Sequence, residues 1–361
     1  MFVAWRDLRF AKGRFALMGS VVVLITLLVG LLSGLTAGLG RQNTSAITSM
    51  PADHIVFGTP ADGQDLSYAE SVVTESQWSR VATTAGVSSA DPVGISTSKA
   101  AAGSSHLTVS AFGVQSGSPL VPGGAPEGED TAVLTAPVAE SLGVGPGDVI
   151  TVAGRDLTVV AVHGDESFGH LPVIWIDLGT WRHISPPAGA GADRTATFVA
   201  LRTTDDFDAT ATDRLAGTTT VSKSASLSAI GSYASENGSL QLMRGFLFVI
   251  SALVIGAFFT VWTIQRSGDI AVLEALGAST GRLVRDALGQ ALVVLIGGTA
   301  LGTALAAAAG AALSGSVPFA LTPATLLLPA AVMIVLGSLG AAIAVRRITS
   351  VDPLTALGSA R

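Results

Sequence analysis

The stretch FALMGSVVVLITLLVGLLSGLTAGLG, residues 15–40, holds no charged side chain and lies between Arg14 and Arg41. A transmembrane helix needs about 20 consecutive apolar residues to cross about 30 Å of hydrocarbon. The stretch therefore predicts a first membrane-spanning helix. Its apolar core is about twice as long as the core of a signal peptide, which favours a retained helix over a cleaved leader.

Two further charge-free stretches predict three more spans. One runs from residue 245 to residue 265. The other, residues 287–345, is interrupted by Pro318 and Pro323, and because proline breaks helices it divides into two spans with a turn between them. The predicted spans are 241–265, 287–313 and 324–345, with a short outer loop at 314–323.

The composition agrees with a membrane protein. Hydrophobic residues make up 49% of the 361 residues and charged residues only 13%, whereas a soluble domain carries about 25% charged residues. The chain has no cysteine, which excludes disulfides, thiolate metal sites and cysteine nucleophiles. The net charge of −6 provides no overall basic surface for a nucleic acid, so we expect no nucleic-acid partner.

The distribution of Lys and Arg predicts the orientation, because these residues concentrate on the cytoplasmic side of a membrane. They lie at the same-side ends of the four spans: Arg6, Arg9, Lys12, Arg14, Arg266, Arg282, Arg285, Arg346 and Arg347. We expect a multi-pass protein of the cytoplasmic membrane. Its cytoplasmic parts are an amphipathic N-terminus at 1–14, a loop at 266–286 and a tail at 346–361, so both termini are cytoplasmic.

Residues 41–240 then form one large extracellular domain between the first two spans. Alternating apolar residues predict strands, and 3.6-residue periodicity predicts helices. The expected strands are 54–57, 149–152, 157–162, 173–176 and 198–201, and the expected helices are 77–83, 136–142 and 206–215. The predicted fold class is thus four transmembrane α-helices with an α+β extracytoplasmic domain inserted between helices 1 and 2.

The predicted cytoplasmic loop contains one apolar helical face. Ile270, Leu273 and Leu276 are spaced three apart, and Gly277 follows as a helix end. By periodicity alone this is a helix lying on the membrane surface. No nucleotide site accompanies it, because a phosphate-binding loop needs a lysine after a glycine and none of Lys12, Lys99 and Lys223 follows one.

Four segments together resemble a known family. Arg266 and Asp269 precede an aliphatic run and Ala-Leu-Gly-Ala-Ser at 275–279, which resembles the cytoplasmic loop of FtsX/MacB-type ABC transporter permeases. The acid of that family's loop is usually Glu, so Asp269 departs mildly. The N-terminal Trp5–Arg9, the tail 346–357 and the outer stretch 134–148 are similar to the corresponding parts of the same family.

This resemblance implies a partner that supplies the energy. The family's permeases are homodimers that do not catalyse a reaction, and two copies of a separate cytoplasmic ABC ATPase bind and hydrolyse ATP. The resemblance assigns coupling to that ATPase to the loop residues Asp269, Ile270, Leu273 and Leu276.

Within the family, the size, the single outer domain and the absence of cysteine resemble the haem-efflux permeases of Gram-positive bacteria. The expected function is therefore extraction of haem, or a similar lipophilic molecule, from the outer leaflet of the cytoplasmic membrane, with haem as transported ligand and no intrinsic cofactor. Alternatives are export of a lipophilic peptide, antibiotic or lipoprotein, and mechanical signalling to a cell-wall hydrolase without transport. A receptor lacking any ATPase is disfavoured by the loop and tail motifs.

Gly30, Gly34 and Gly38 form a small-residue stripe in the outer half of the first span. Small residues let another backbone approach closely within a lipid bilayer. Two interpretations follow: the stripe packs against helices of the same subunit, or it lies at the dimer axis, where its groove could also admit a flat ligand.

A candidate haem site lies where the second span leaves the membrane. Tyr233, Glu236 and Met243 share one helical face, with Arg244 adjacent, and Glu236 is the only acid between Asp213 and Asp269. We hypothesise that the Glu236 carboxylate ligates the haem iron, that Tyr233 and Met243 line the ring, and that Arg244 meets a propionate. The alternative is a solvated stalk with Arg244 reaching lipid headgroups, and Asn237-Gly238 is typical of a turn.

One further cluster contains residue types that bind metal ions. His163 and His170 flank Asp165 and Glu166, but their spacing matches no known ligand pattern. The segment is therefore interpreted as a solvated loop between two strands.

Overall fold

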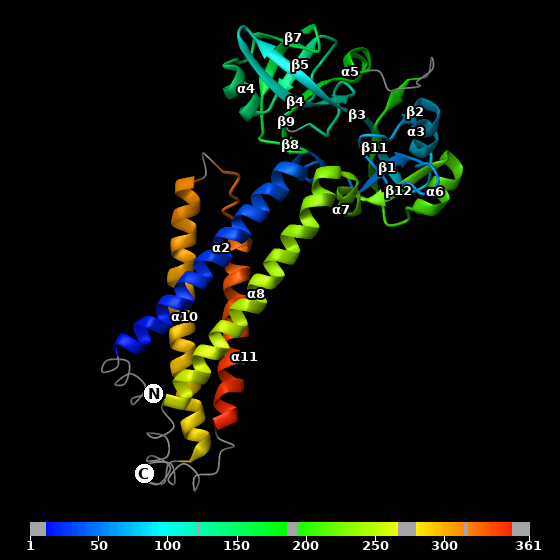
Figure 1. Ribbon diagram of the computed structural model, residues 1–361. Coiled ribbons are helices and arrows are strands. Elements are labelled where there is room, and N and C mark those ends of the chain that lie inside the picture. Colours follow the sequence, from blue (N-terminus) through cyan, green and yellow to red (C-terminus); the bar gives the residue numbers. More distant parts are fainter. Residues whose placement is uncertain (1–11, 122, 186–193, 266–278, 314–316, 349–361) are drawn as a thin grey trace. The chain divides into compact units, whose positions relative to one another are not determined.

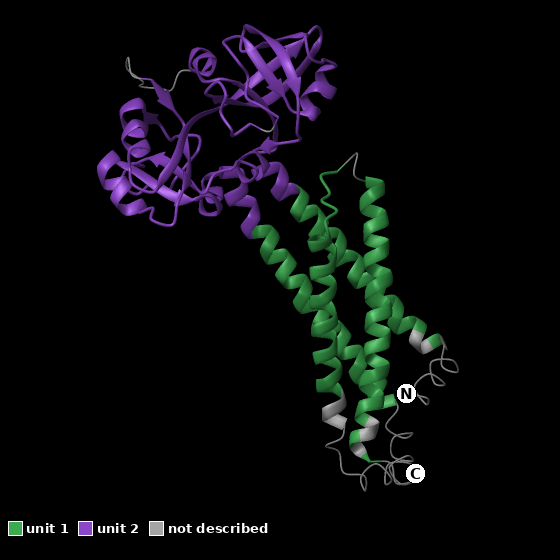
Figure 2. Ribbon diagram, turned by 180° about the vertical axis from the view of Figure 1, so that it is seen from behind, with its two compact units in different colours: residues 1–38, 239–361 green, residues 39–238 purple. Residues whose placement is uncertain are grey.

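The computed structural model describes residues 12–121, 123–185, 194–265, 279–313 and 317–348. The chain divides into two compact units (Figure 2). Unit 1 is Met1–Gly38 with Ser239–Arg361, and unit 2 is Leu39–Gly238.

The described part of unit 1 contains four long helices, two of which continue into unit 2. They are α2 (Lys12–Thr48), α8 (Gly231–Gln265), α10 (Thr280–Leu313) and α11 (Pro323–Ile348) (Figure 1). All four are long and apolar enough to cross a membrane. Both α2 and α8 extend beyond the predicted spans into unit 2.

The turn predicted at Asn237-Gly238 is wrong, because both residues lie inside α8. A glycine costs a helix interior only about 1 kcal/mol relative to alanine. A helix of 35 residues tolerates that cost.

The helices of unit 1 pack through a shared apolar core. Phe259 and Trp262 of α8 join Leu295 of α10 and Met333 of α11, all of them buried. A Cβ on Gly340 would lie 3.2 Å from the Cα of Gly256. The two glycines thus allow α8 and α11 to approach backbone to backbone, which dispersion forces favour inside a bilayer.

Unit 2 is built on a ten-stranded sheet with the order β12-β1-β11-β3-β4-β9-β5-β7-β6, and β8 pairs with β9. Because β6 also pairs with β3, the six strands from β3 to β6 along this order close on themselves as a small barrel. The remaining three strands continue from β3 as an open sheet.

The strands are β1 (His54–Gly58), β3 (Val87–Ala102), β4 (Ser105–Val114), β5 (Thr131–Leu134), β6 (Val149–Val152), β7 (Arg155–Val162), β8 (Ser167–Phe168), β9 (Leu171–Asp177), β11 (Phe198–Thr203) and β12 (Thr218–Ser222), with a separate small pair of β2 (Val73–Thr74) and β10 (Thr195–Ala196). The helices are α3 (Glu75–Ala82), α4 (Ala136–Leu142), α5 (Leu178–Ile184), α6 (Ala209–Ala216) and α7 (Lys223–Ser226).

The first and last strands of unit 2 are neighbours. Strands β1 and β12 pair antiparallel along their whole lengths. Lys223, directly after β12, donates its Nζ hydrogens to the carbonyls of Thr48 at 3.2 Å and Met50 at 2.8 Å. The segment that enters unit 2 and the segment that leaves it are therefore held side by side.

An aromatic cluster forms the centre of the larger core in unit 2. The ring of Tyr68 makes edge-to-face contacts with Phe57, Phe168 and Phe198 at centroid distances of 4.8, 5.5 and 5.2 Å. Its buried hydroxyl donates to Oγ of Ser226 at 2.9 Å. Burial raises the pKa of Tyr68 well above its ordinary value, so this hydroxyl keeps its proton.

Candidate functional site

Three side chains from distant parts of unit 2 meet at one point. They are Asn43 in the last turns of α2, His170 in the turn between β8 and β9, and Glu236 in the first turns of α8. Nε2 of His170 lies 3.1 Å from Oε1 and 3.0 Å from Oε2 of Glu236. Nδ2 of Asn43 lies 3.2 Å from the same Oε2. The carboxylate is thus approached by two nitrogens from two other elements.

The geometry decides where the protons lie. Nε2 of a neutral imidazole either donates or accepts, and both carboxylate oxygens accept. Since Nε2 of His170 faces both oxygens of Glu236, it carries the proton and donates to them. Nδ2 of Asn43 donates to Oε2 of Glu236 and also lies 2.9 Å from that ring nitrogen.

A strained turn presents the imidazole. Phe168 and Leu171 pair across β8 and β9, which leaves Gly169 and His170 as a two-residue loop with φ of 57° and 66°. Positive φ at both positions is typical of the type I′ hairpin turn, and it is uncommon for a residue other than glycine. The turn is fixed to α2, because the amides of Gly169 and His170 donate to the carbonyls of Asn43 and Gln42 at 3.1 and 3.2 Å.

Asn43 is fixed on its other side as well. The hydroxyl of Ser232 on α8 donates to its Oδ1, and Asn43 is only 1% exposed. The side chains of His170 and Glu236 remain 31% and 42% exposed. The cluster is thus anchored at Asn43 and open at Glu236.

Two other contacts join α2 to residues shortly before this turn. Oγ of Ser45 donates to the carbonyl of Ser167 and accepts from its amide at 3.2 and 2.8 Å. Arg41 makes two hydrogen bonds to Asp165 at 3.0 and 2.9 Å. The latter pair is more than half exposed, and an exposed ion pair contributes at most about 1 kcal/mol.

The structure adds to two expectations for this region. Glu236, the only acid in its stretch of sequence, has partners that lie 66 and 193 positions away. Residues 163–165 are exposed in a loop, as expected, but the neighbouring Glu166 is only 7% exposed, and its Oε2 accepts no hydrogen bond from the described residues. The considered metal set with His163 does not assemble either, since the described part of the chain holds no group of three or more residues arranged for a metal ion.

The other residues of the predicted haem face lie in different surroundings. Tyr233 is half-buried and packs against the larger core of unit 2. Met243 and Arg244 belong to unit 1. Met243 is 48% exposed, and the guanidinium of Arg244 lies 5.9 Å from the ring centre of Phe248.

The glycine stripe on α2 contacts segments of the same chain. A Cβ on Gly30 would lie 2.8 Å from Cβ of Ala306, and one on Gly38 would lie 2.0 Å from the carbonyl oxygen of Pro318. Gly34 is covered by the ring of Phe319. These contacts correspond to packing within one subunit.

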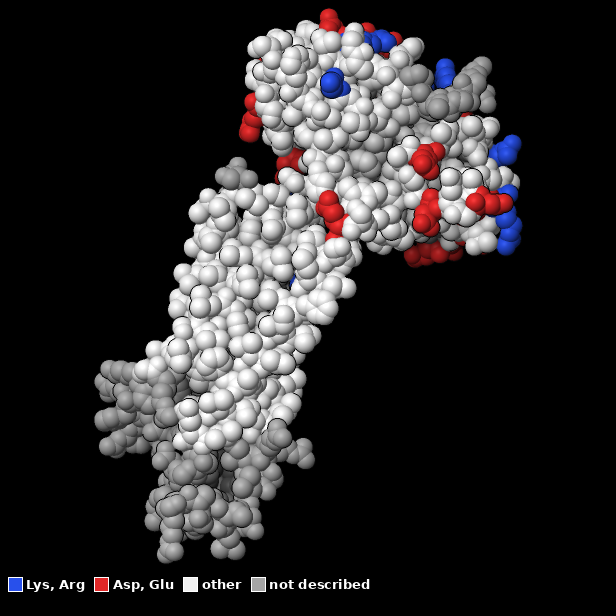
Figure 3. Space-filling model, viewed as in Figure 1, with Lys and Arg blue, Asp and Glu red and all other residues white. Residues whose placement is uncertain are grey.

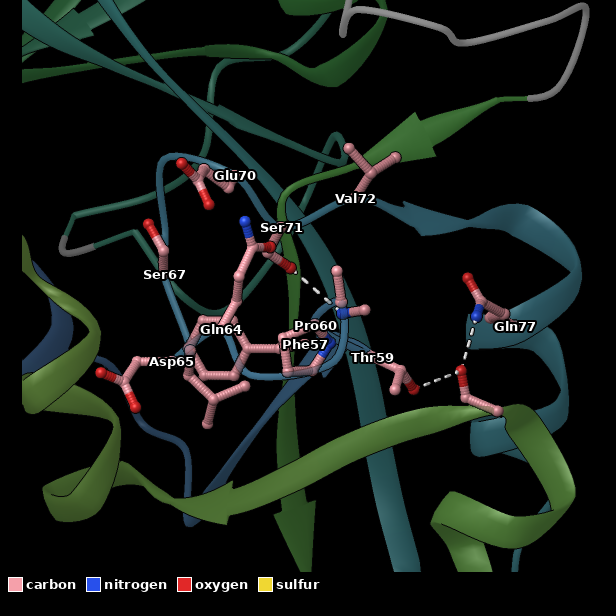
Figure 4. A pocket seen from close by; sticks show the side chains of 14 residues that line it. Phe57, Thr59, Pro60, Gln64, Asp65, Ser67, Glu70, Ser71, Val72 and Gln77 are labelled. Atoms are coloured by element: carbon pink, nitrogen blue, oxygen red, sulfur yellow. Dashed lines mark hydrogen bonds between the residues drawn. The ribbon is translucent and has the colours of Figure 1, made fainter.

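Unit 2 also contains a pocket, lined by polar and apolar residues, that the sequence did not indicate (Figure 4). Its volume is about 310 Å³. Thr59 and Gln77 both donate to the carbonyl of Gly217 at 3.1 and 2.8 Å. The other polar side chains of its lining are Gln64, Asp65, Ser67, Glu70 and Ser71.

Charged side chains gather on unit 2. On the face shown in Figure 3, Lys, Arg, Asp and Glu lie over unit 2, while the described parts of the helices of unit 1 show almost none. This distribution is expected for helices in lipid, where an unpaired charge is costly.

The predicted coupling residues Asp269, Ile270, Leu273 and Leu276 lie outside the described residues.

Comparison with known families gives two matches, which together include residues of both units. The MacB-like periplasmic core domain matches residues 15–216, and the FtsX-like permease C-terminal domain matches residues 242–353. The chain belongs to the FtsX/MacB-type ABC transporter permeases. It is therefore a membrane protein, and its family implies a partner ATPase.

Relatives match this permease over almost its whole length. A protein named as a hemin transport system permease, HrtB, from Staphylococcus haemolyticus is 25% identical over 374 aligned residues, covering 99% of each chain. The HrtB of Staphylococcus epidermidis is 24% identical over 363 residues, with the same coverage. An uncharacterised ABC transporter permease of Mycobacterium tuberculosis is 24% identical over 371 residues, again covering 99% of each chain.

Among solved structures, the periplasmic region of MacB from Actinobacillus actinomycetemcomitans matches 50% of the permease and 92% of its own chain. Its sequence identity is 14% and its TM-score is 0.35.

Proposed function

We propose that this permease is the transmembrane subunit of an efflux pump that extracts haem, or a similar lipophilic molecule, from the outer leaflet of the cytoplasmic membrane. The observation that carries the proposal is the end-to-end similarity to two proteins named as hemin transport permeases. In this proposal two copies of the permease assemble with two copies of a separate ATPase. Both termini are cytoplasmic and unit 2 is extracellular, as the Lys and Arg distribution favours.

We further propose that Glu236 supplies the oxygen that binds the haem iron. Its side chain is 42% exposed, so a carboxylate edge is accessible to a ligand. Oxygen ligation binds the iron less strongly than a thiolate, which suits a pump that has to release its cargo. Met243 and Arg244, farther along α8, are proposed to contact the ring edge and a propionate. Tyr233 is half-buried against the larger core of unit 2, and its contact with the ring stays a prediction.

The test uses the purified permease–ATPase complex in detergent and titrates it with haem. Glu236→Ala should weaken haem binding and shift the Soret band. Glu140→Ala, which removes an exposed carboxylate from α4, is the matched control and should do neither. Metal-free protoporphyrin is the second ligand. If Glu236 contacts the iron, its loss should weaken haem binding more than protoporphyrin binding.

Unchanged affinity and spectrum in Glu236→Ala would remove Glu236 from the site. Absence of haem-stimulated ATP hydrolysis in the wild-type complex would contradict haem as the substrate.

One observation favours a second candidate function, mechanical signalling to a cell-wall hydrolase. Helices α2 and α8 each have residues in both units, and in this second candidate function they pass a movement of the membrane helices on to unit 2. A complex with this function should increase its ATP hydrolysis in response to a protein partner and not in response to haem.

A further inference from the structure

We infer that Asn43 and His170 are positioning residues for Glu236: they hold its carboxylate in one orientation, with one edge free, before a ligand arrives. This inference rests on the proposed role of Glu236 as the residue that binds the transported haem. It assigns a function to two residues that the sequence patterns did not connect with each other or with Glu236.

The first argument is the direction of the hydrogen bonds. A carboxylate has about four acceptor positions on its two oxygens. Nε2–H of His170 and Nδ2–H of Asn43 approach Glu236 at 3.0 to 3.2 Å, and the Asn43 amide reaches only Oε2. Acceptor capacity therefore remains, chiefly on Oε1, for one more partner on the exposed side.

The second argument is that neither donor is free to move. Asn43 is 1% exposed, and its Oδ1 is held by Ser232. His170 lies in a two-residue turn with a positive φ of 66°. A non-glycine residue keeps such a conformation only where its surroundings hold it there, and such residues cluster at functional sites.

The third argument concerns what the ligand gains. A free glutamate side chain loses rotamer freedom when it binds a ligand. A carboxylate that is already ordered loses less, so its affinity is higher for the same contact. Hydrogen bonds from a second residue to a metal-binding side chain have the same effect, and removing them typically weakens metal binding between about 10-fold and 100-fold.

A purely structural role for the cluster makes a different prediction, and Ser45 separates the two. Ser45 joins α2 to β8, directly before the same turn, through two hydrogen bonds to Ser167, and neither of these bonds involves Glu236. If the cluster only fastens α2 to the loop, Ser45→Ala should have the same effect on the ligand as His170→Ala.

The experiment compares haem affinity, the Soret spectrum and the thermal midpoint of the complex for six variants. They are Glu236→Ala, His170→Ala, His170→Gln, Asn43→Ala, Asn43→Asp and Ser45→Ala. His170→Ala and Asn43→Asp should weaken haem binding about 10-fold or more and change the Soret band. His170→Gln, whose amide can donate from the same place, should restore most of the affinity. Ser45→Ala should lower the thermal midpoint without changing the spectrum.

Each other result overturns a stated claim. If Glu236→Ala loses haem while His170→Ala and Asn43→Asp keep wild-type affinity and spectrum, the positioning role is wrong and the proposed function stands. If Ser45→Ala weakens haem binding as much as His170→Ala, and His170→Gln restores no affinity, the cluster only holds α2 against the β8–β9 segment and does not position Glu236. If Glu236→Ala binds haem normally, the proposed role of Glu236 is wrong and the positioning role falls with it.

Discussion

The ring of Phe319 occupies the position that a side chain on Gly34 would need. A Cβ on Gly34 would lie 2.2 Å from Cζ of this ring, and one on Gly310 would lie 2.3 Å from its Cε1. The amide of Ala320 donates to the carbonyl of Gly34 at 3.1 Å. The segment between α10 and α11 thus inserts an aromatic wedge between two glycines, one on α2 and one on α10.

We therefore predict that Gly34→Ala destabilises the permease, because the new methyl group overlaps a ring. Overpacking of this kind typically costs about 1–3 kcal/mol. Phe319→Ala should destabilise by a different route, through loss of packing. The double variant should be more stable than the sum of the two single effects predicts. Thermal midpoints of the four proteins in one detergent measure this coupling.

The control for Gly34 is Gly19→Ala on the same helix, since a Cβ there meets nothing within 4 Å. It should be neutral or slightly stabilising. Additive effects in the double variant would show that the ring of Phe319 is not the neighbour of Gly34 in the assembled protein.

A second prediction concerns the residues that we expect to couple the permease to its ATPase, a role assigned from the sequence alone. Leu273→Asp should separate the permease from its ATPase, because burial of a leucine side chain contributes about 1.5–3 kcal/mol and a carboxylate cannot replace it. Copurification of the ATPase and haem-stimulated hydrolysis are the measurements. Ser279→Asp adds the same charge beyond the predicted helix end and should leave both unchanged. A Leu273→Asp complex with normal coupling would exclude this loop face.

The third prediction follows from Asp91 in β3. Burial raises the pKa of Asp91 above its ordinary 3.8, against the effects of a hydrogen bond from Ser89 and the charge of Arg202. Because the folded state holds the proton more tightly than the unfolded state, the ionised carboxylate destabilises the fold. This cost is complete above the raised pKa and disappears below the ordinary value.

Asp91→Asn should therefore be more stable than the wild type at pH 7, and this difference should shrink as the pH falls from the raised pKa towards 3.8 and be absent below that value. Thermal unfolding at a series of pH values measures it. A stabilisation that does not change with pH would show that ionisation of Asp91 is not its cause.

A fourth prediction concerns the centre of the aromatic cluster. Tyr68→Phe removes a buried hydrogen bond to Ser226 and should cost about 1 kcal/mol, because Ser226 still donates to the carbonyl of Lys223. Tyr68→Ala also removes a ring with three aromatic neighbours and should cost about 3–5 kcal/mol. Denaturant unfolding of unit 2, followed by tryptophan fluorescence, separates the two values. Equal costs would mean that the hydroxyl, not the ring, holds the cluster.

The long helices could be predicted from the sequence because hydrophobic length is a local property. The charge-free stretches found all four, although α2 and α8 continue past them on polar residues. Strands with apolar alternation, such as β6 and β7, were also found. The two longest strands, β3 and β4, were missed. Their Ala, Ser and Gly residues have low strand propensity, and their pairing with each other and with β9 and β11 holds them extended.

The cluster at Glu236 could be predicted only in part. The sequence shows that Glu236 is the only acid between Asp213 and Asp269, but it does not show which distant side chain faces it. Asn43 and His170 are 127 residues apart, and no local period connects them. One signal was present: Gly169-His170 between the apolar Phe168 and Leu171 is a pattern that a two-residue hairpin loop produces.

Because β1 pairs with β12, the chain enters and leaves unit 2 at neighbouring positions. Most of unit 2 is therefore an insertion that could be exchanged as a whole. Because the Lys223 side chain reaches the carbonyl of Thr48, the backbone that enters and the backbone that leaves are separated by little more than the length of one side chain. A linker of a few residues, at about 3.3 Å per residue, could replace everything between them while the ends of α2 and α8 keep their spacing. Evolution can enlarge, shrink or exchange such an insert without redesigning the membrane helices, so relatives with one transport machinery can differ in what they present outside it.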